Sequence, residues 1–313
     1  MPVLYPNAPD PVRTPTTPAI PPMLPLLSLL GIAAILSIAL VTVMTTYRAR
    51  HPHRRTAGYA VARGCACDPG ERDLAFIEWT LDRPDGAALP VWDITFDDAR
   101  DLAVVLVHGW GQSRIDMLAR LEPWPDLAGH AALYDLRGHG DASGGPSRLG
   151  ADEHLDLLAL LERLDDHPRI VLVGFSMGAE IVIRAAASDH PARARIAGLV
   201  LHGAYVDFDI ALRARLRRQH LPTRPITDLM RTWLRLVGVR HVNLLDEIRR
   251  VACPVLFVHG EADDIAPPDD AARLAAAVAD GTVWTVPDGR HLDAHGVDPA
   301  GLAAATRAFV ERL

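Results

Sequence analysis

The 313-residue sequence contains no lysine, and all 32 of its basic residues are arginine. We attribute this choice to the codon bias of the genome rather than to function. Aromatic residues make up only 5% of the chain, and the formal net charge is −7. Surfaces that bind nucleic acids are usually basic and rich in aromatic side chains. The composition therefore argues against a nucleic-acid partner.

Cysteine is also scarce, with three residues in the whole chain. This number is too small for a disulfide framework. Cys65 and Cys67 are separated by one residue, but no second pair of ligands follows them as in a structural zinc site, and Cys253 stands alone. We interpret the three cysteines as incidental and expect no metal site.

Charged residues are rare at the N-terminal end. Residues 1–25 contain nine prolines and only two charged side chains, Asp10 and Arg13, which predicts an extended, unfolded tail over residues 1–23. Residues 24–44 carry no charge, and a helix of that length spans about 31 Å, close to the hydrocarbon core of a bilayer. We predict a membrane-anchoring transmembrane helix over residues 24–46 and a juxtamembrane linker over residues 47–72.

A cleaved signal peptide is the alternative interpretation of this apolar segment. Signal peptides begin with a short basic region and end at a small-residue cleavage site, whereas here a proline-rich tail precedes the apolar run and Thr-Thr-Tyr-Arg follows it. The positive-inside rule places the C-terminal side in the cytoplasm, because four arginines follow the segment and Arg13 precedes it. The four are Arg48, Arg50, Arg54 and Arg55.

Signals for β-strands and α-helices alternate along residues 73–313. After an opening strand pair, the strands are apolar runs, as in sheets covered on both faces. This predicts one α/β domain, a mostly parallel sheet with helices on both faces, whose ligands bind at the carboxyl ends of the strands. We expect strands at 76–81, 91–96, 102–109, 132–135, 169–175, 196–204, 253–260 and 282–287, and helices near 114–121, 152–164, after Ser176, near 269–279 and at the C-terminus.

A serine between two glycines marks one strand end, in the sequence Gly174-Phe-Ser176-Met-Gly178. Glycines there permit a strand-to-helix turn so tight that flanking side chains would collide. The Ser176 hydroxyl would then lie just before a helix N-terminus, where N–H groups and the helix dipole favour negative charge. Acyl transfer requires its nucleophile in such a place, although this short motif also occurs by chance.

Further motifs follow the other expected strands. They are HGWGQ at 108–112, YDLRGHGDASG at 134–144, HGEADDIAP at 259–267 and PDGRHLD at 287–293. Together with GFSMGAE they stand in the order of the α/β-hydrolase family, which the chain resembles from about residue 73 to its end. Within that family it looks most like the small membrane-anchored Bem46-like hydrolases, because of the N-terminal anchor, the insert before the seventh strand and the histidine in PDGRHLD.

The resemblance implies a Ser-His-Asp triad in the chain order of this fold. Ser176 is a poor nucleophile until a base takes its proton, and His291, on the loop after the last strand, is the matching base. An acid would hold the imidazole in the required tautomer. HGEADDIAP offers Asp263 and Asp264, and the resemblance selects Asp263, three residues after the glycine and four before the proline.

The oxyanion that forms during acyl transfer requires backbone donors already in place. The candidates are the N–H groups of Trp110, in HGWG, and of Met177, directly after the nucleophile. Gly109 and Gly111 would let the first loop approach the substrate. This chemistry needs no cofactor and no metal ion, and we expect neither.

The remaining histidines and one aspartate near these motifs are interpreted as structural. His108, His139 and His259 are expected to shape the loops at the strand ends. His295 follows His291 by four residues, a spacing that on a helix is compatible with a metal pair, but no third ligand lies nearby in the sequence. Asp135 ends a strand and could act as an acid; we favour a role in supporting its loop.

The insert at residues 206–251 occupies the lid position of this fold. It contains ten arginines against five acidic residues, and its apolar side chains at helical spacing predict an amphipathic cover. The candidates for substrate contact are Met230, Trp233 and Leu234, with Leu229 and Val237 beside them. A helical cap with a solvated basic face is the plain interpretation, and a cap that contacts anionic lipid headgroups is the alternative.

These features predict a membrane-anchored serine hydrolase that cleaves an acyl ester or thioester, a small-molecule or lipid-like substrate, through an acyl-enzyme. A peptidase of the prolyl-oligopeptidase type is the alternative enzyme. A hydrolase-fold binding protein that has lost catalysis is the alternative outside the enzymes. Because the catalytic core is expected to begin near residue 73, a protein without residues 1–55 should be soluble and active.

Overall fold

The computed structural model describes residues 23–96 and 100–313. The chain divides into two compact units, and the division falls between Val41 and Thr42. The tail expected over residues 1–23 lies outside the described residues, except for Met23, which begins a helix.

Helix α1, Met23–Arg50, contains the apolar segment. From Leu26 to Arg50 its mean hydropathy is 2.6, and its large apolar side chains are exposed, among them Leu29 (64%) and Ile35 (66%). Exposed apolar surface of this extent is typical of a segment that contacts a membrane or another protein. Among the described helices, α1 alone is long and apolar enough to cross a membrane. The expected span of residues 24–46 lies within it.

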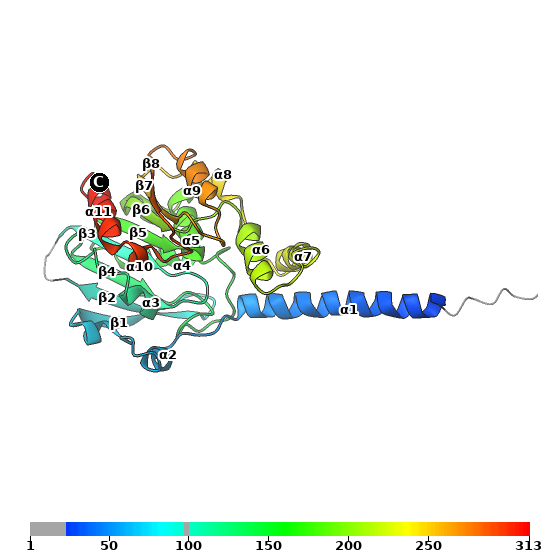
Figure 1. Cartoon of the computed structure of the whole chain (residues 1–313). Helices are drawn as coiled ribbons and strands as arrows, with labels where there is room; N and C mark the ends of the chain where they lie inside the picture. Colours follow the sequence, from blue (N-terminus) through cyan, green and yellow to red (C-terminus); the bar gives the residue numbers. More distant parts are fainter. Residues whose placement is uncertain (1–22, 97–99) are drawn as a thin grey trace, which may run out of the picture. The chain divides into compact units, whose positions relative to one another are not determined.

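An eight-stranded sheet forms the centre of the second unit (Figure 1). The strand order is β1-β2-β4-β3-β5-β6-β7-β8; β2 is antiparallel to both of its neighbours and the other pairs are parallel. This confirms the expected mostly parallel sheet. The strands are β1 Ala75–Asp82, β2 Ala88–Thr95, β3 Leu102–Val107, β4 His130–Tyr134, β5 Arg169–Phe175, β6 Ile196–His202, β7 Val255–Gly260 and β8 Gly281–Val286.

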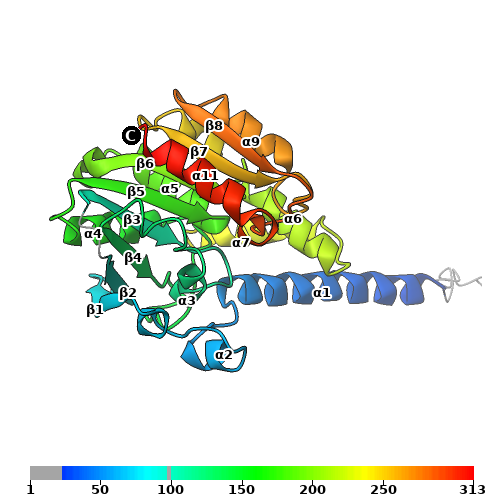
Figure 2. The same cartoon turned by 60° about the vertical axis from the view of Figure 1, so that its left-hand side comes forward.

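Helices cover both faces of this sheet. One apolar core joins the sheet to α4, α5, α8 and α9, and the other joins it to α3 and α11, with α11 in front of the strands in Figure 2. Strand β3 serves both cores, because Val105 and Val107 point to the first and Val104 and Leu106 to the second. The helices outside the insert are α2 Ala57–Val61, α3 Arg114–Leu118, α4 His154–Arg163, α5 Met177–Ala187, α9 Pro268–Ala275, α10 Ala294–Val297 and α11 Pro299–Val310, with 3₁₀ turns at Pro69–Arg72 and Pro191–Arg195.

Some element boundaries differ from those expected. Strand β2 begins at Ala88 rather than at residue 91, because its antiparallel pairing with β1 continues through Pro90, which lies opposite Thr80. Pairing of β2 with β4 begins only at Val91. The missing N–H of Pro90 therefore interrupts no ladder on that side. The helix expected near residues 269–279 is α9, which ends at Ala275.

The insert at residues 206–251 forms three helices, α6 Phe208–Arg218, α7 Ile226–Leu236 and α8 Leu244–Ile248. Helices α6 and α7 contact each other outside the two helical layers (Figure 1). Helix α8 packs against α5. The part of the insert that stands apart from the layers is therefore α6 and α7.

The C-terminal end of α1 belongs to the second unit, which begins at Thr42. The indole N–H of Trp110 donates a hydrogen bond of 2.7 Å to the carbonyl oxygen of Ala49. The backbone N–H of Ser147 donates one of 2.9 Å to the carbonyl oxygen of Arg50. The compact unit thus also includes residues before the expected start near residue 73, because contacts with residues far along the chain hold this segment in place.

These contacts also change the expectation for truncated proteins. Removal of residues 1–41 leaves the second unit whole, and we expect a soluble, folded protein. Removal of residues 1–55 deletes the hydrogen bonds of Ala49 and Arg50 and that of Arg54, which donates to Ala142 O at 2.6 Å. At about 1 kcal/mol each, their loss should lower the melting temperature by about 10 °C relative to the shorter truncation. Scanning fluorimetry of both proteins checks this, and equal melting temperatures would contradict it.

Candidate active site

The turn between β5 and α5 holds Ser176 in a strained conformation. Its backbone has φ 54° and ψ −110°, a combination that costs a non-glycine residue on the order of 1–3 kcal/mol. The N–H of Ser176 donates a hydrogen bond of 2.8 Å to the carbonyl oxygen of His202, at the end of the neighbouring strand β6. Packing on both sides of the turn therefore fixes the serine directly before Met177, the first residue of α5.

Packing also explains the two flanking glycines. A Cβ atom on Gly178 would lie 2.0 Å from the carbonyl oxygen of Val107, and one on Gly174 would lie 2.6 Å from the Cα of Ala179. Both distances are far below van der Waals contact, and in both cases the obstacle is backbone. Helix α5 could not start so close to β3 and β5 with any larger residue at either position.

Three residues from distant parts of the chain meet at this turn. Nε2 of His291 lies 2.9 Å from Oγ of Ser176, and Nδ1 of His291 lies 2.7 Å from Oδ2 of Asp263. An ionised carboxylate only accepts hydrogen bonds, so Nδ1 carries the ring proton and Nε2 accepts one from the serine hydroxyl. The three residues expected from the sequence thus form one continuous hydrogen-bonded chain.

Backbone groups of its own loop hold Asp263. Its Oδ1 accepts hydrogen bonds of 2.8 Å from Ile265 N–H and 2.9 Å from Ala266 N–H. Burial by itself would raise the pKa of this carboxyl, but the hydrogen bond and charge of His291 and the two backbone donors leave the pKa below its ordinary value. The group is therefore ionised at neutral pH.

The neighbouring aspartate, Asp264, has a different partner. Its carboxylate forms an ion pair with the guanidinium of Arg218 on α6, and Nε of Arg218 lies 2.9 Å from Oδ2 of Asp264. Both side chains are about half exposed. Of the two adjacent aspartates, Asp263 contacts the histidine and Asp264 contacts the lid.

The residues expected to supply oxyanion donors also lie at this site. Trp110 and Met177 line one pocket together with Ser176. Met177 is in the first turn of α5, where backbone N–H groups have no partner within the helix. The loop that carries Trp110 approaches the serine closely, since a Cβ on Gly109 would lie 2.9 Å from the Phe175 carbonyl oxygen.

Three other histidines are bound into loops. Nδ1 of His108 donates to the carbonyl oxygen of Gly109 at 2.8 Å, and its Nε2 accepts from the N–H of Leu136 at 3.0 Å. Burial lowers the pKa of His108 to about 4 and that of His139 to about 3. His139 and His259 each contact a backbone carbonyl at 2.9 Å. These contacts support the structural role expected for all three.

Asp135 and His295 contact other groups. The carboxylate of Asp135 accepts hydrogen bonds from the N–H groups of Arg114 (2.8 Å) and Asp141 (2.9 Å), so it supports the loop after β4. Burial raises its pKa to about 6. His295 contacts the guanidinium of Arg120. A cation in direct contact with the imidazole ring disfavours a metal ion on the same ring.

One surface group within the described residues has three ligand atoms close enough for a metal ion, from Cys67, Asp68 and Glu71, all within 4.8 Å of one another. The Sγ of Cys67 donates to Glu71 Oε1 at 3.0 Å, and this hydrogen bond raises the pKa of the thiol. A metal requires the thiolate, which a raised pKa disfavours. The Cys-x-Cys pattern gave no sign of this group, because carboxylates supply two of its three atoms.

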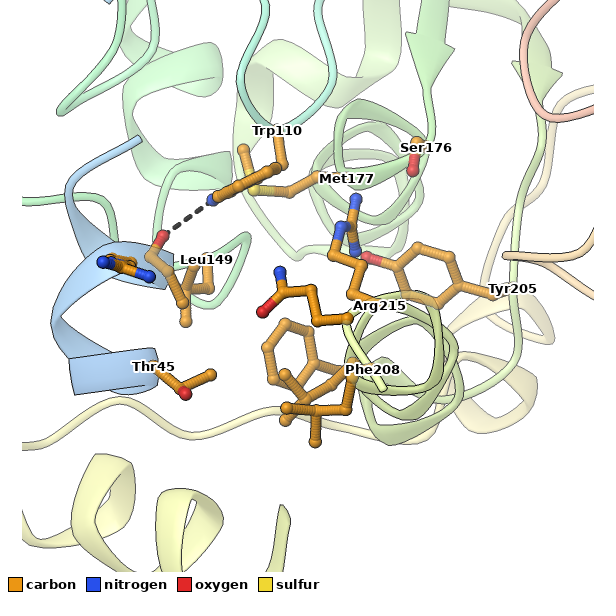
Figure 3. A pocket seen from close by; sticks show the side chains of 13 residues that line it. Thr45, Trp110, Leu149, Ser176, Met177, Tyr205, Phe208 and Arg215 are labelled. Atoms are coloured by element: carbon orange, nitrogen blue, oxygen red, sulfur yellow. Dashed lines mark hydrogen bonds between the residues drawn. The ribbon is translucent and has the colours of Figure 1, made fainter. Parts of the chain in front are cut away.

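A pocket opens beside Ser176 (Figure 3). Its walls come from the end of α1, the loops of Trp110 and Leu149, the start of α5, the loop after β6, and helix α6. Among the described residues, no Asp or Glu lines it. The lining residues are Thr45, Arg48, Ala49, Trp110, Leu149, Ser176, Met177, Tyr205, Phe208, Leu212, Arg215, Leu216 and Gln219.

The lid residues of this pocket lie on α6 rather than on α7. Met230 and Leu234, two of the three expected candidates, are buried. Leu234 joins a small apolar cluster with Leu149, and Trp233 lies under the guanidinium of Arg50, 5.7 Å from the ring centre. The apolar face of α7 thus packs against the lid and the loop of Leu149, and we move the candidates for substrate contact to α6.

The pocket-lining residues of α6 also follow helical spacing. Phe208, Leu212, Arg215 and Leu216, and Gln219 directly after the helix, follow the three- and four-residue spacing of one helix face. The arginine within this stripe weakens its apolar pattern, and the stripe was missed for that reason. Their common position beside Ser176 is visible only in the folded chain.

Comparisons with known proteins agree with this arrangement. A family model described as "Alpha/beta hydrolase family" matches residues 104–305. The chain is 28% identical over 179 residues to the uncharacterised protein YqkD of Bacillus subtilis, covering 55% of this chain and 58% of that protein, which is less than two thirds of its length. It is 30% identical over 143 residues to the protein bem46 of Schizosaccharomyces pombe, covering 44% and 42%. This similarity supports the resemblance stated from the motifs.

A solved structure shares the fold over nearly its whole length. The esterase PF2001 of Pyrococcus furiosus superposes with a TM-score of 0.67 at 21% identity, covering 84% of this chain and 97% of that one. At this level of identity the comparison establishes the fold alone.

Proposed function

The chain belongs to the alpha/beta hydrolase family, and from this premise we propose that it is a serine hydrolase that cleaves an acyl ester or thioester through an acyl-enzyme. The observation that carries the proposal is the continuous chain from Ser176 Oγ through the His291 ring to Asp263, with distances of 2.9 and 2.7 Å. It lies at the edge of a pocket with apolar walls. The known esterase with the same fold supports ester chemistry.

In this mechanism His291 acts first as a base and then as an acid. As Ser176 Oγ attacks the carbonyl carbon of the substrate, its proton passes to Nε2 of His291, and Asp263 stabilises the imidazolium. The same proton then passes to the leaving alkoxide or thiolate, and the acyl group stays on Oγ. Water, deprotonated by His291, attacks the acyl-enzyme and releases the acid and Ser176.

The developing oxyanion would be held by the backbone N–H groups of Met177 and Trp110. Their loop and helix are fixed by packing before the substrate arrives, so they need no rearrangement during the reaction. No residue of this mechanism requires a cofactor or a metal ion.

We also propose that α1 anchors the enzyme in a membrane with the catalytic unit in the cytoplasm. The arginines that follow the apolar segment favour this orientation. Contacts of Ala49 and Arg50 with the catalytic unit favour retention of the helix over its removal as a signal sequence. Protease added to the cytoplasmic side of sealed vesicles should digest the catalytic unit, and digestion from the opposite side only would overturn the orientation.

A substrate panel tests the reaction class. We expect the purified protein to hydrolyse para-nitrophenyl esters of medium-length acids and to leave prolyl and other peptide anilides intact, because the pocket walls are mostly apolar. Cleavage of anilides in preference to esters would instead favour a peptidase. Absence of both activities, with no labelling by a fluorophosphonate, would favour a binding protein and contradict the proposal.

A further inference from the structure

One arginine in the pocket of Ser176 has no anionic partner in the part of the chain that the structure describes. Arg215, on α6, extends into the pocket between the side chains of Met177 and Tyr205 (Figure 3). Its guanidinium lies over the ring of Trp110, 5.0 Å from the ring centre. Within residues 23–96 and 100–313, no carboxylate forms an ion pair with it.

The neighbouring arginines of α6 are in ordinary environments. Arg213 pairs with Asp209 at 3.5 Å, and Arg218 pairs with Asp264. Arg217 is exposed to water. Arg215 alone on this helix combines partial burial with the absence of a counter-ion among the described residues.

Burial makes this absence costly. Burial is the largest cause that lowers the pKa of Arg215. Tyr205 raises this pKa by less than burial lowers it, and the charge of Arg218 lowers it by a still smaller amount. An arginine nevertheless stays protonated in proteins. A charge removed from water without a counter-ion is destabilising unless something pairs with it. The contact with Trp110 offsets only part of that cost.

A second cation faces the same pocket from another element. Arg48, near the end of α1, also lines the pocket, and no ion pair of its guanidinium occurs in the described part of the chain. No Asp or Glu is among the lining residues. The nearby buried Glu180 is engaged by Tyr205, which donates to it at 3.0 Å, and by His241 at 3.3 Å. The pocket therefore carries net positive charge on otherwise mostly apolar walls.

We propose that Arg215, assisted by Arg48, forms a subsite for an anionic group, so that the substrate is an acyl ester that bears a carboxylate or phosphate. The apolar lining holds the hydrocarbon chain, and the guanidinium groups pair with the anion by charge-assisted hydrogen bonds. This inference rests on the proposed esterase function and specifies its substrate class. A neutral ester would exclude water from the pocket when it binds and would leave the charge of Arg215 unpaired there.

Matched substrate pairs test the subsite. The first pair is para-nitrophenyl hexanoate and para-nitrophenyl hydrogen adipate, which places the charge on the acyl side. The second is monodecanoylglycerol and its phosphate monoester, which places the charge on the alcohol side. We expect the wild-type protein to favour the anionic member of at least one pair by about tenfold or more in kcat/KM. Preference for the neutral member in both pairs would overturn the subsite.

Variants assign the preference to the proposed residues. Arg215→Met should reduce the ratio of anionic to neutral kcat/KM to about one, and Arg215→Lys should retain part of it, since charge persists without the planar donor pair. Arg48→Met should reduce the ratio less, because its side chain is exposed. The control is Arg217→Met on the same helix, for which we expect an unchanged ratio. An unchanged ratio in Arg215→Met would contradict the proposal.

Binding without catalysis separates this inference from the proposed function. Decyl phosphate, below its micelle concentration, should raise the melting temperature of the wild-type protein and of Arg217→Met but not of Arg215→Met. Decanol should not discriminate between these proteins. If this pattern appears while neither neutral nor anionic esters are hydrolysed, the anion subsite stands and the esterase function fails. If the neutral ester is hydrolysed and Arg215→Met has no effect in either assay, the esterase function stands and the anion subsite fails.

Discussion

Replacement of Ser176 by alanine is expected to lower the turnover of an activated ester by roughly a million-fold, as loss of the nucleophile does when a triad acts as a unit. The alanine methyl group cannot attack a carbonyl, and neither His291 nor Asp263 can replace the missing oxygen. The remaining activity would come from the backbone donors and the pocket, which still favour attack by water. Substrate binding should change little.

Two measurements check this expectation. Initial rates on para-nitrophenyl hexanoate give the loss in turnover, and a fluorophosphonate probe should label the wild-type protein but not Ser176→Ala. Ser188→Ala is the matched control, because Ser188 ends the same helix and its hydroxyl donates only to the carbonyl oxygen of Ala185, at 2.7 Å. Labelling of Ser176→Ala at the wild-type level would show that another residue is the nucleophile.

Most of the sheet and the Ser-His-Asp arrangement were predictable from the sequence. Strands β3, β5 and β7 are buried on both faces, and such strands are recognisable as uninterrupted apolar runs. Loops that follow parallel strands meet at one edge of the sheet. Local signals thus placed the loops of Ser176, Asp263 and His291 at one edge of the sheet, and the resemblance to the hydrolase family selected Asp263 over Asp264.

The walls of the pocket were less predictable, because they depend on contacts between segments far apart in the sequence. Arg48 and Arg215 lie on α1 and α6, more than a hundred residues apart, and no local pattern indicates that both line one cavity. The amphipathic pattern favoured α7 as the helix that contacts substrate, because its apolar face is more pronounced than that of α6. An apolar stripe indicates burial, and it does not distinguish burial against substrate from burial against protein.

The same limit applied to the segment after the apolar helix. Residues 47–72 contain no long apolar run, so they were expected to form a linker. Their attachment depends on individual hydrogen bonds, such as that from Trp110 to the carbonyl oxygen of Ala49. Such bonds leave no periodic signal in a sequence.

The two adjacent aspartates are expected to differ by about three orders of magnitude in their effect on turnover. Asp263→Asn should lower turnover by about four orders of magnitude, the effect of losing a triad carboxylate in another serine hydrolase. The N–H groups of Ile265 and Ala266 donate to Oδ1 of Asp263, so an asparagine at this position keeps its amide oxygen on them. Its NH₂ group must then face His291.

An amide NH₂ that donates to Nδ1 would impose the wrong tautomer on His291, with the ring proton on Nε2. A protonated Nε2 cannot accept the proton of Ser176. Asp264→Asn is the matched control, since it removes a charge from the same loop. Its pair with Arg218 is about half exposed on both sides, and such pairs contribute about 1 kcal/mol or less, so turnover should fall by about tenfold or less. Rates of both variants on one activated ester, with melting temperatures to confirm folding, decide between the two aspartates. A larger loss for Asp264→Asn would mean that the acid of the triad is the second aspartate and that the loop adopts a different register.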